Sequence, residues 1–121
     1  MTMEAVHYLV EFSVKPGKLE DFKEIANWFI EKCEAEEPGT MGYRWYLGED
    51  GTKCYLHETF NDSAGLVNHA SGPRVQGRIG DLLETGDITR FEAFGNPDAA
   101  AAEVLAGFGA VTYPYFNGFA R

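Results

Sequence analysis

The chain of 121 residues fits one compact domain with its own core and is too short for two. Ten Lys and Arg against 19 Asp and Glu give a formal charge of -9, which disfavours nucleic acid and anionic membranes as partners. There is no long apolar run, and residues 1–10 lack both a basic start and a cleavage site, so we expect a cytoplasmic protein. Cys33 and Cys54 have neither CxxC nor metal-ligand spacing, which predicts buried free thiols.

Residues 4–14 alternate apolar and polar side chains, which predicts a strand with one buried face. Pro16 and Gly17 end it. Apolar residues then recur at spacings of three and four from Leu19, which predicts an amphipathic helix through about Glu36.

Residues 40–60 predict two strands joined at Asp50-Gly51, the strongest short signal for a hairpin. A two-residue loop would place Tyr43 opposite Glu58, and a bulge would break this register. One face of the hairpin would then carry Met41, Tyr43, Trp45, Leu47, Cys54, Leu56, Glu58 and Phe60.

A short helix is predicted after a cap at Asn61 or Asp62, and Gly72-Pro73 interrupts it before helical spacing resumes up to Gly86. Residues 87–94 predict a fourth strand. Asn96-Pro97 predicts the start of another helix, with Asn96 as its cap, and residues 110–121 a final extended segment.

This order of elements predicts an α+β fold, a ferredoxin-like split βαβ sandwich whose four-stranded antiparallel sheet has helices on one face. The uncovered face would display Leu9, Tyr46, Tyr55 and His57. Such a patch usually packs against another subunit, so we expect a homodimer joined sheet to sheet, in which the C-terminal arm is a candidate for exchange.

Three stretches resemble the antibiotic biosynthesis monooxygenase (ABM) family of dimeric α/β-barrel proteins: "VEFSVKPGKLEDF", "AEEPGTMGYRWYL" and "HETFNDSAGLVNHASGP". The resemblance implies an ABM-like domain over residues 1–95, with residues 96–121 adding a helix and an arm to the same domain. It also implies a ligand cleft between sheet and helices, and in catalytic members a cofactor-independent oxygenation of phenols or quinols. By position, Glu58, Phe60, Tyr43 and His69 match the aligned Glu, aromatic, Tyr and helix His of the family.

Glu58 is the first catalytic candidate, because it is the only charged residue on its face of the hairpin. Burial would raise its pKa and suit it to act as a general base, or it would simply be a structural carboxylate paired with Tyr43. His69 lies about 120° from the apolar centre of its helix, so we expect it at the edge of the cleft or outside it. There it would shuttle a proton, contact a ligand, or only interact favourably with the dipole at the C-terminal end of its helix.

The predicted substrate contacts are Tyr43, Trp45, Phe60 and Asn68, with Tyr43 and Trp45 stacking on a flat ring. Neither a metal nor another cofactor is expected. The leading hypothesis is therefore an ABM-like monooxygenase for a small planar aromatic. The alternative is a non-catalytic dimer that binds a small ligand or has a stress-related role. Haem binding or degradation is a lesser alternative, because haem-degrading relatives have Trp where Phe60 stands and an Asn on the first strand.

Overall fold

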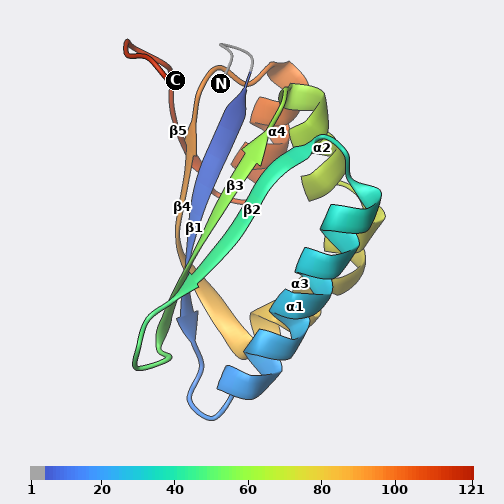
Figure 1. Ribbon diagram of the computed structural model, residues 1–121, viewed down its shortest axis with the longest axis vertical. Coiled ribbons are helices and arrows are strands. Elements are labelled where there is room, and N and C mark those ends of the chain that lie inside the picture. The colour runs from blue at the N-terminus through green and yellow to red at the C-terminus, as the bar shows by residue number, and fades with distance from the viewer. Residues whose placement is uncertain (1–4) are drawn as a thin grey trace.

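The computed structural model describes residues 5–121 and has one sheet covered by helices (Figure 1). The first predicted strand was to begin at residue 4, which lies outside the described residues. In chain order the elements are β1 (Val6–Val14), α1 (Leu19–Glu36), β2 (Thr40–Leu47), β3 (Lys53–Phe60), α2 (Ser63–Ala70), α3 (Pro73–Thr85), β4 (Gly86–Phe94), α4 (Ala99–Gly107) and β5 (Val111–Tyr113).

The sheet has the order β2-β3-β1-β4-β5, and its first four strands are antiparallel. The predicted ferredoxin-like α+β fold is therefore confirmed. The sheet has one strand more than predicted, because β5 pairs in parallel with the end of β4 and makes the sheet mixed. A three-residue strand is too short to show the alternation by which the other strands were recognised.

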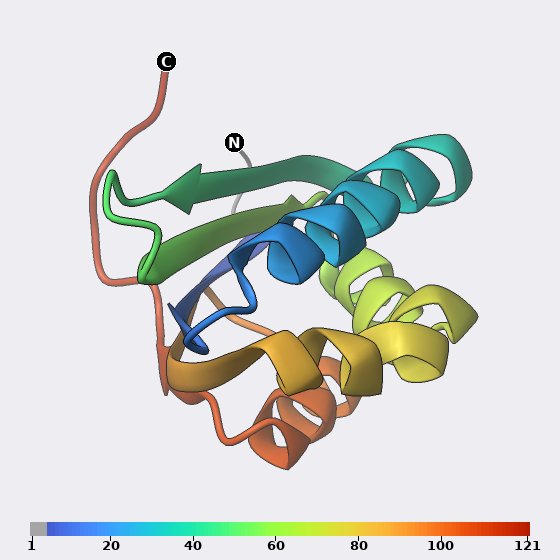
Figure 2. The ribbon, with the colours of Figure 1, turned by 90° about the horizontal axis from the view of Figure 1, so that it is seen from below.

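The helices lie on one side of the sheet, and the opposite side is open (Figure 2). On β1, alternate residues from Val6 to Val14 are buried beneath the helices, as the alternation predicted. The open side displays Tyr46 at 51% exposure and Val111 at 54%. In the part of the chain that the structure describes, no helix is long and apolar enough to cross a membrane.

The hairpin register was predicted correctly up to a bulge near the start of β2. Tyr43 lies opposite Glu58, as expected from the Asp50-Gly51 signal. Met41 opposite Phe60 was wrong: the register shifts between Thr40 and Gly42, so Thr40 takes that place and Met41 is 65% exposed. The turn is also wider than two residues, because the ladder ends at Leu47 and Cys54.

Local capping explains where the later helices begin. Asp62 accepts a hydrogen bond from the Gly65 amide at 2.9 Å and starts α2. Gly72 separates α2 from α3, and a side chain there would meet the Asn68 carbonyl oxygen at 2.1 Å. The cap of α4 is Asp98 rather than the predicted Asn96, because the Asp98 carboxylate accepts the Ala101 amide.

Candidate functional site

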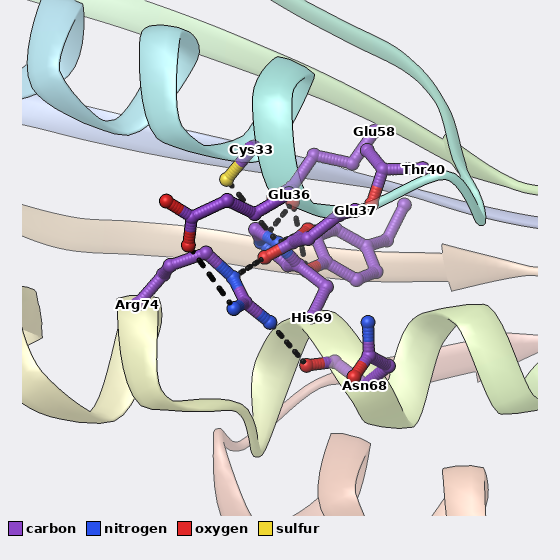
Figure 3. Close-up of polar contacts among 9 residues, drawn as sticks. Cys33, Glu36, Glu37, Thr40, Glu58, Asn68, His69 and Arg74 are labelled. Carbon is purple, nitrogen blue, oxygen red and sulfur yellow. Dashed lines mark hydrogen bonds and ion pairs between the residues drawn. The ribbon is translucent and has the colours of Figure 1, made fainter.

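His69 lies in the last turn of α2 and is held between two carboxylates (Figure 3). Its Nε2 is 2.8 Å from Oε1 of Glu58, and its Nδ1 is 2.7 Å from Oε1 of Glu37. The prediction that His69 lies at a cleft edge or outside was wrong, because the residue is only 3% exposed. The apolar residues of α2 alone would leave His69 on a solvent-facing side of the helix. The end of α1 covers that side and places Glu37 and Cys33 against the His69 ring.

Glu58 is buried on β3, as predicted, and is 3% exposed. Its hydroxyl partner is Tyr8 of β1, which donates to Oε1 at 2.9 Å, rather than the expected Tyr43. Both the Tyr8 and the His69 contact fall on Oε1. Glu58 also lines the cavity described below, so its carboxylate is the acceptor that a ligand there would meet.

Glu37 closes the far side of the cluster and was not identified from the sequence. Its Oε1 also accepts the Thr40 hydroxyl at 2.8 Å, and its Oε2 accepts Nε–H of Arg74 from α3. Both oxygens are therefore occupied by donors, which is how a 2% exposed carboxylate remains ionised. Arg74 also lies 3.5 Å from Glu36 at the surface.

The charges of this cluster fix the protonation state of its members. Burial lowers the pKa of His69, but the charge of Glu58 and the hydrogen bonds with Cys33, Glu37 and Glu58 outweigh burial and raise the pKa to about 12. Burial raises the pKa of Glu37, but its bonds with His69 and Arg74 lower it to about 2. At neutral pH the ring is therefore an imidazolium, which can donate a proton but has no lone pair to accept one.

Two tyrosines face the same carboxylate and remain protonated. Burial, followed by the charge of Glu58, raises the pKa of Tyr8 and of Tyr43 well above the ordinary value. The Tyr43 ring lies 5.4 Å from the His69 ring and 5.7 Å from that of Trp45. The cluster therefore offers hydroxyl donors and one carboxylate acceptor.

A cavity of about 40 Å³ adjoins this cluster between the sheet and the helices. Its polar lining consists of Tyr8, Tyr43, Glu58 and His69. The remaining lining is apolar: Val10, Phe12, Phe29, Leu56, Ala70, Val75, Ile79, Leu82, Ile88, Phe91 and Phe108. The cavity holds a water-sized group, whereas pockets for drug-sized ligands begin at about 300 Å³.

The cavity brings together three of the six predicted site residues: Tyr43, Glu58 and His69. Trp45 does not line it, and its ring instead stacks on Phe12 at 5.7 Å. Phe60 is fully buried outside the lining, and Asn68 is exposed. The structure adds Tyr8 to the predicted set. Tyr8 was missed because its place in the alternating apolar strand β1 is typical of a core residue.

The model of the family described as antibiotic biosynthesis monooxygenase matches residues 5–77. The chain belongs to this family. Its fold is similar to that of MupZ from Pseudomonas fluorescens, with a TM-score of 0.83 and 25% identity over 98% of this chain and 95% of MupZ. None of the curated proteins compared with the chain matches it.

Two further structures share the fold over a smaller part of the chain. A conserved protein from Methanosarcina mazei has a TM-score of 0.69 at 21% identity, over 78% of this chain and 94% of its own. A protein from Caulobacter crescentus, described as a candidate antibiotic biosynthesis monooxygenase, has a TM-score of 0.69 at 15% identity, over 78% and 92%. The match to MupZ is the more extensive and takes in nearly the whole chain.

Proposed function

We propose that this ABM protein binds a small phenol- or quinol-type molecule beside Glu58 and oxygenates it without metal or flavin. The observation that carries the proposal is the buried Glu58 carboxylate, which borders a largely apolar cavity. A carboxylate in that setting is suited to remove a hydroxyl proton from a ligand that has also left water. The proposed oxygenation itself is an inference from membership of the family.

In the proposed reaction Glu58 takes the acidic proton, from a hydroxyl of a quinol or from the ring CH₂ of an anthrone, and the His69 imidazolium stabilises the resulting anion. The anion then passes electrons to molecular oxygen. For an anthrone, the ring CH₂ becomes a carbonyl: one oxygen atom enters the substrate, the other leaves as water, and all four electrons come from the substrate. The reaction therefore balances without an external reductant.

A two-ring substrate needs more room than the cavity of about 40 Å³ provides. Ile79 and Leu82 of α3 and Phe108 after α4 are part of the helix side of the cavity. We infer that these side chains move outward when a planar ligand enters against Tyr43. In this proposal Trp45, Phe60 and Asn68 act as substrate contacts only if the opening reaches them.

The catalytic proposal is tested by following oxygen uptake with anthrones or naphthoquinols. We expect Glu58→Gln to lower the rate by about 10²-fold or more, because an amide cannot accept the proton. Glu49→Gln, exposed in the hairpin turn, is the matched control and should keep the wild-type rate. Equal rates for Glu58→Gln and wild type would remove Glu58 from the mechanism.

A second candidate function is non-catalytic binding, by a protein that senses or stores a small molecule or acts in stress. The small cavity and the complete pairing of His69 and Glu37 favour it. The two candidates differ in a simple measurement. A ligand that changes the fluorescence of the tryptophans but gives no oxygen uptake would favour binding alone.

We further propose a homodimer that uses the open side of the sheet, and its cytoplasmic location stays a prediction. The helices leave that side uncovered (Figure 2). The strand register places Tyr46 and Val111 on it, and both are exposed. Sedimentation equilibrium should give twice the 13.4 kDa mass of the chain, and Tyr46→Glu should shift the equilibrium toward the monomer. Glu34→Gln on the helix side is the control, and a wild-type mass of one chain would refute the dimer.

A further inference from the structure

A continuous set of polar contacts runs from the cavity to the protein surface. Glu58 borders the cavity, His69 joins Glu58 to Glu37, and Glu37 joins the ring to Arg74. The Arg74 side chain is 12% exposed, whereas those of His69, Glu37 and Glu58 are at most 4% exposed. Figure 3 shows the His69 ring lying between the two carboxylates, with the Arg74 guanidinium on the far side of Glu37.

We propose that Glu37 is a positioning residue that keeps His69 a double donor, so that one N–H always points at Glu58 and the site accepts ligands that become anions. The inference names the class of ligand for the proposed function, namely molecules that become anions. The claim about the protonation of His69 stands alone, and only the claim about turnover rests on the proposed function. Glu37 touches neither the cavity nor a reacting atom, so it acts through His69.

With Glu37 and Glu58 both ionised, the geometry requires a doubly protonated ring. Each nitrogen of His69 lies 2.7–2.8 Å from a carboxylate oxygen, and an ionised carboxylate only accepts hydrogen bonds. A neutral ring would place one nitrogen lone pair against an oxygen lone pair at that distance. Glu37 cannot resolve this by taking a proton, because the Thr40 hydroxyl and Arg74 already donate to its two oxygens.

The other groups that face the ring do not offset these two carboxylates. Cys33 of α1 lies 3.6 Å from Nδ1, and burial raises the pKa of its thiol, which leaves it neutral. Tyr43 of β2 faces the ring as a neutral phenol. Tyr8 and Arg74 lie one step further out, behind Glu58 and Glu37. The buried charges therefore balance as two carboxylates against one imidazolium and one guanidinium.

Removing the charge of Glu37 should weaken the hold on the second proton of His69. A charge within about 4–6 Å shifts a pKa by about 1–3 units, so Glu37→Gln should lower the titration midpoint of His69 by about that amount. Above the new midpoint the ring would lose a proton, and an anionic ligand beside Glu58 would lose its nearest cation. A flat pH profile for anion binding or turnover would become one that declines toward alkaline pH.

The test is NMR of protein with ¹⁵N- and ¹³C-labelled histidine, with the His69 ring followed from pH 6 to 11. In the wild type we expect both ring nitrogens to remain protonated through pH 9. In Glu37→Gln the midpoint should fall by about 1–3 pH units. Glu36→Gln is the matched control, because the neighbouring Glu36 also lies near Arg74 but is exposed and does not contact the ring.

Two results would overturn the proposal: a wild-type His69 that titrates near pH 6.5, or a Glu37→Gln variant whose His69 ring is as fully protonated at pH 11 as that of the wild type. The first result needs no variant, so the proposal stays testable if Glu37→Gln does not fold. The NMR measurement needs no substrate, and its outcome is separate from that of the oxygen-uptake assay. A doubly protonated His69 in a protein that oxygenates no quinol would refute the proposed reaction and leave the role of Glu37 standing.

Discussion

His69→Gln should lower the free energy of unfolding by about 3–5 kcal/mol at pH 7, because it removes the cation between two buried carboxylates. Glu37 and Glu58 are 2% and 3% exposed, so water cannot take over the role of the imidazolium. Urea unfolding followed by tryptophan fluorescence measures the effect. Glu34→Gln is the control, because Glu34 is exposed on α1, away from the open side of the sheet, and should be nearly neutral when changed.

The same variant should change how stability depends on pH. Folding raises the pKa of His69 from 6.5 to about 12, so its contribution is complete below pH 6.5 and is lost as the pH rises toward 12. In that range the folded protein holds one more proton than the unfolded chain. The difference in stability between wild type and His69→Gln should therefore shrink by about 1.4 kcal/mol per pH unit between pH 7 and 9.

Glu37 affects stability at acid pH, because folding lowers its pKa whereas folding raises that of His69. Its pKa is lowered from 4.5 to about 2, so its contribution is complete above pH 4.5 and is lost as the pH falls toward 2. Together the two groups place the maximum of their joint contribution between about pH 4.5 and 6.5. Wild-type and His69→Gln stabilities that run parallel from pH 7 to 9 would contradict the imidazolium assignment.

The elements of this fold could be predicted because each has a local cause in the sequence. Alternation along β1 reflects one buried face, and the hairpin register follows from the Asp50-Gly51 turn. The bulge at Met41 is marked in the sequence only by the neighbouring Gly42, and a glycine in a strand does not by itself fix where the register shifts. The strand β5 was not predicted, because it forms by pairing with the edge of β4 and its own three residues are too few to show an alternation.

Of the residues that line the cavity, Tyr43, Glu58 and His69 were named from the sequence. The clearest signal is Glu58, a charge that interrupts an apolar strand face. Its partners come from segments far along the chain, and each has an ordinary local reading. Tyr8 fits the apolar alternation of β1, and Glu37 stands beside Pro38 where a solvent-exposed helix end is expected. A buried carboxylate on an apolar face does demand a cation nearby, and that requirement was the one signal that could have placed His69 inside.

Phe60→Ala should lower the free energy of unfolding by about 3–5 kcal/mol, the range for removing a fully buried ring. Phe60 is 0% exposed and lies against the rings of Tyr8 and His69, with centroids 5.4 and 5.5 Å away. Urea unfolding measures the change. Phe116→Ala is the control, because Phe116 is 95% exposed and its removal should alter stability by less than about 0.5 kcal/mol.

The Phe60 variant also separates two roles for the family's aromatic position. Phe60 does not line the cavity, so its packing role predicts a large loss of stability whether or not a ligand is present. A substrate contact predicts the reverse, with little change in stability and a clear rise in KM. Phe60→Leu, which keeps most of the apolar volume, should restore much of the stability if packing is the role. If Phe60→Leu binds ligand poorly while remaining as stable as wild type, Phe60 is a substrate contact, reached when the cavity opens.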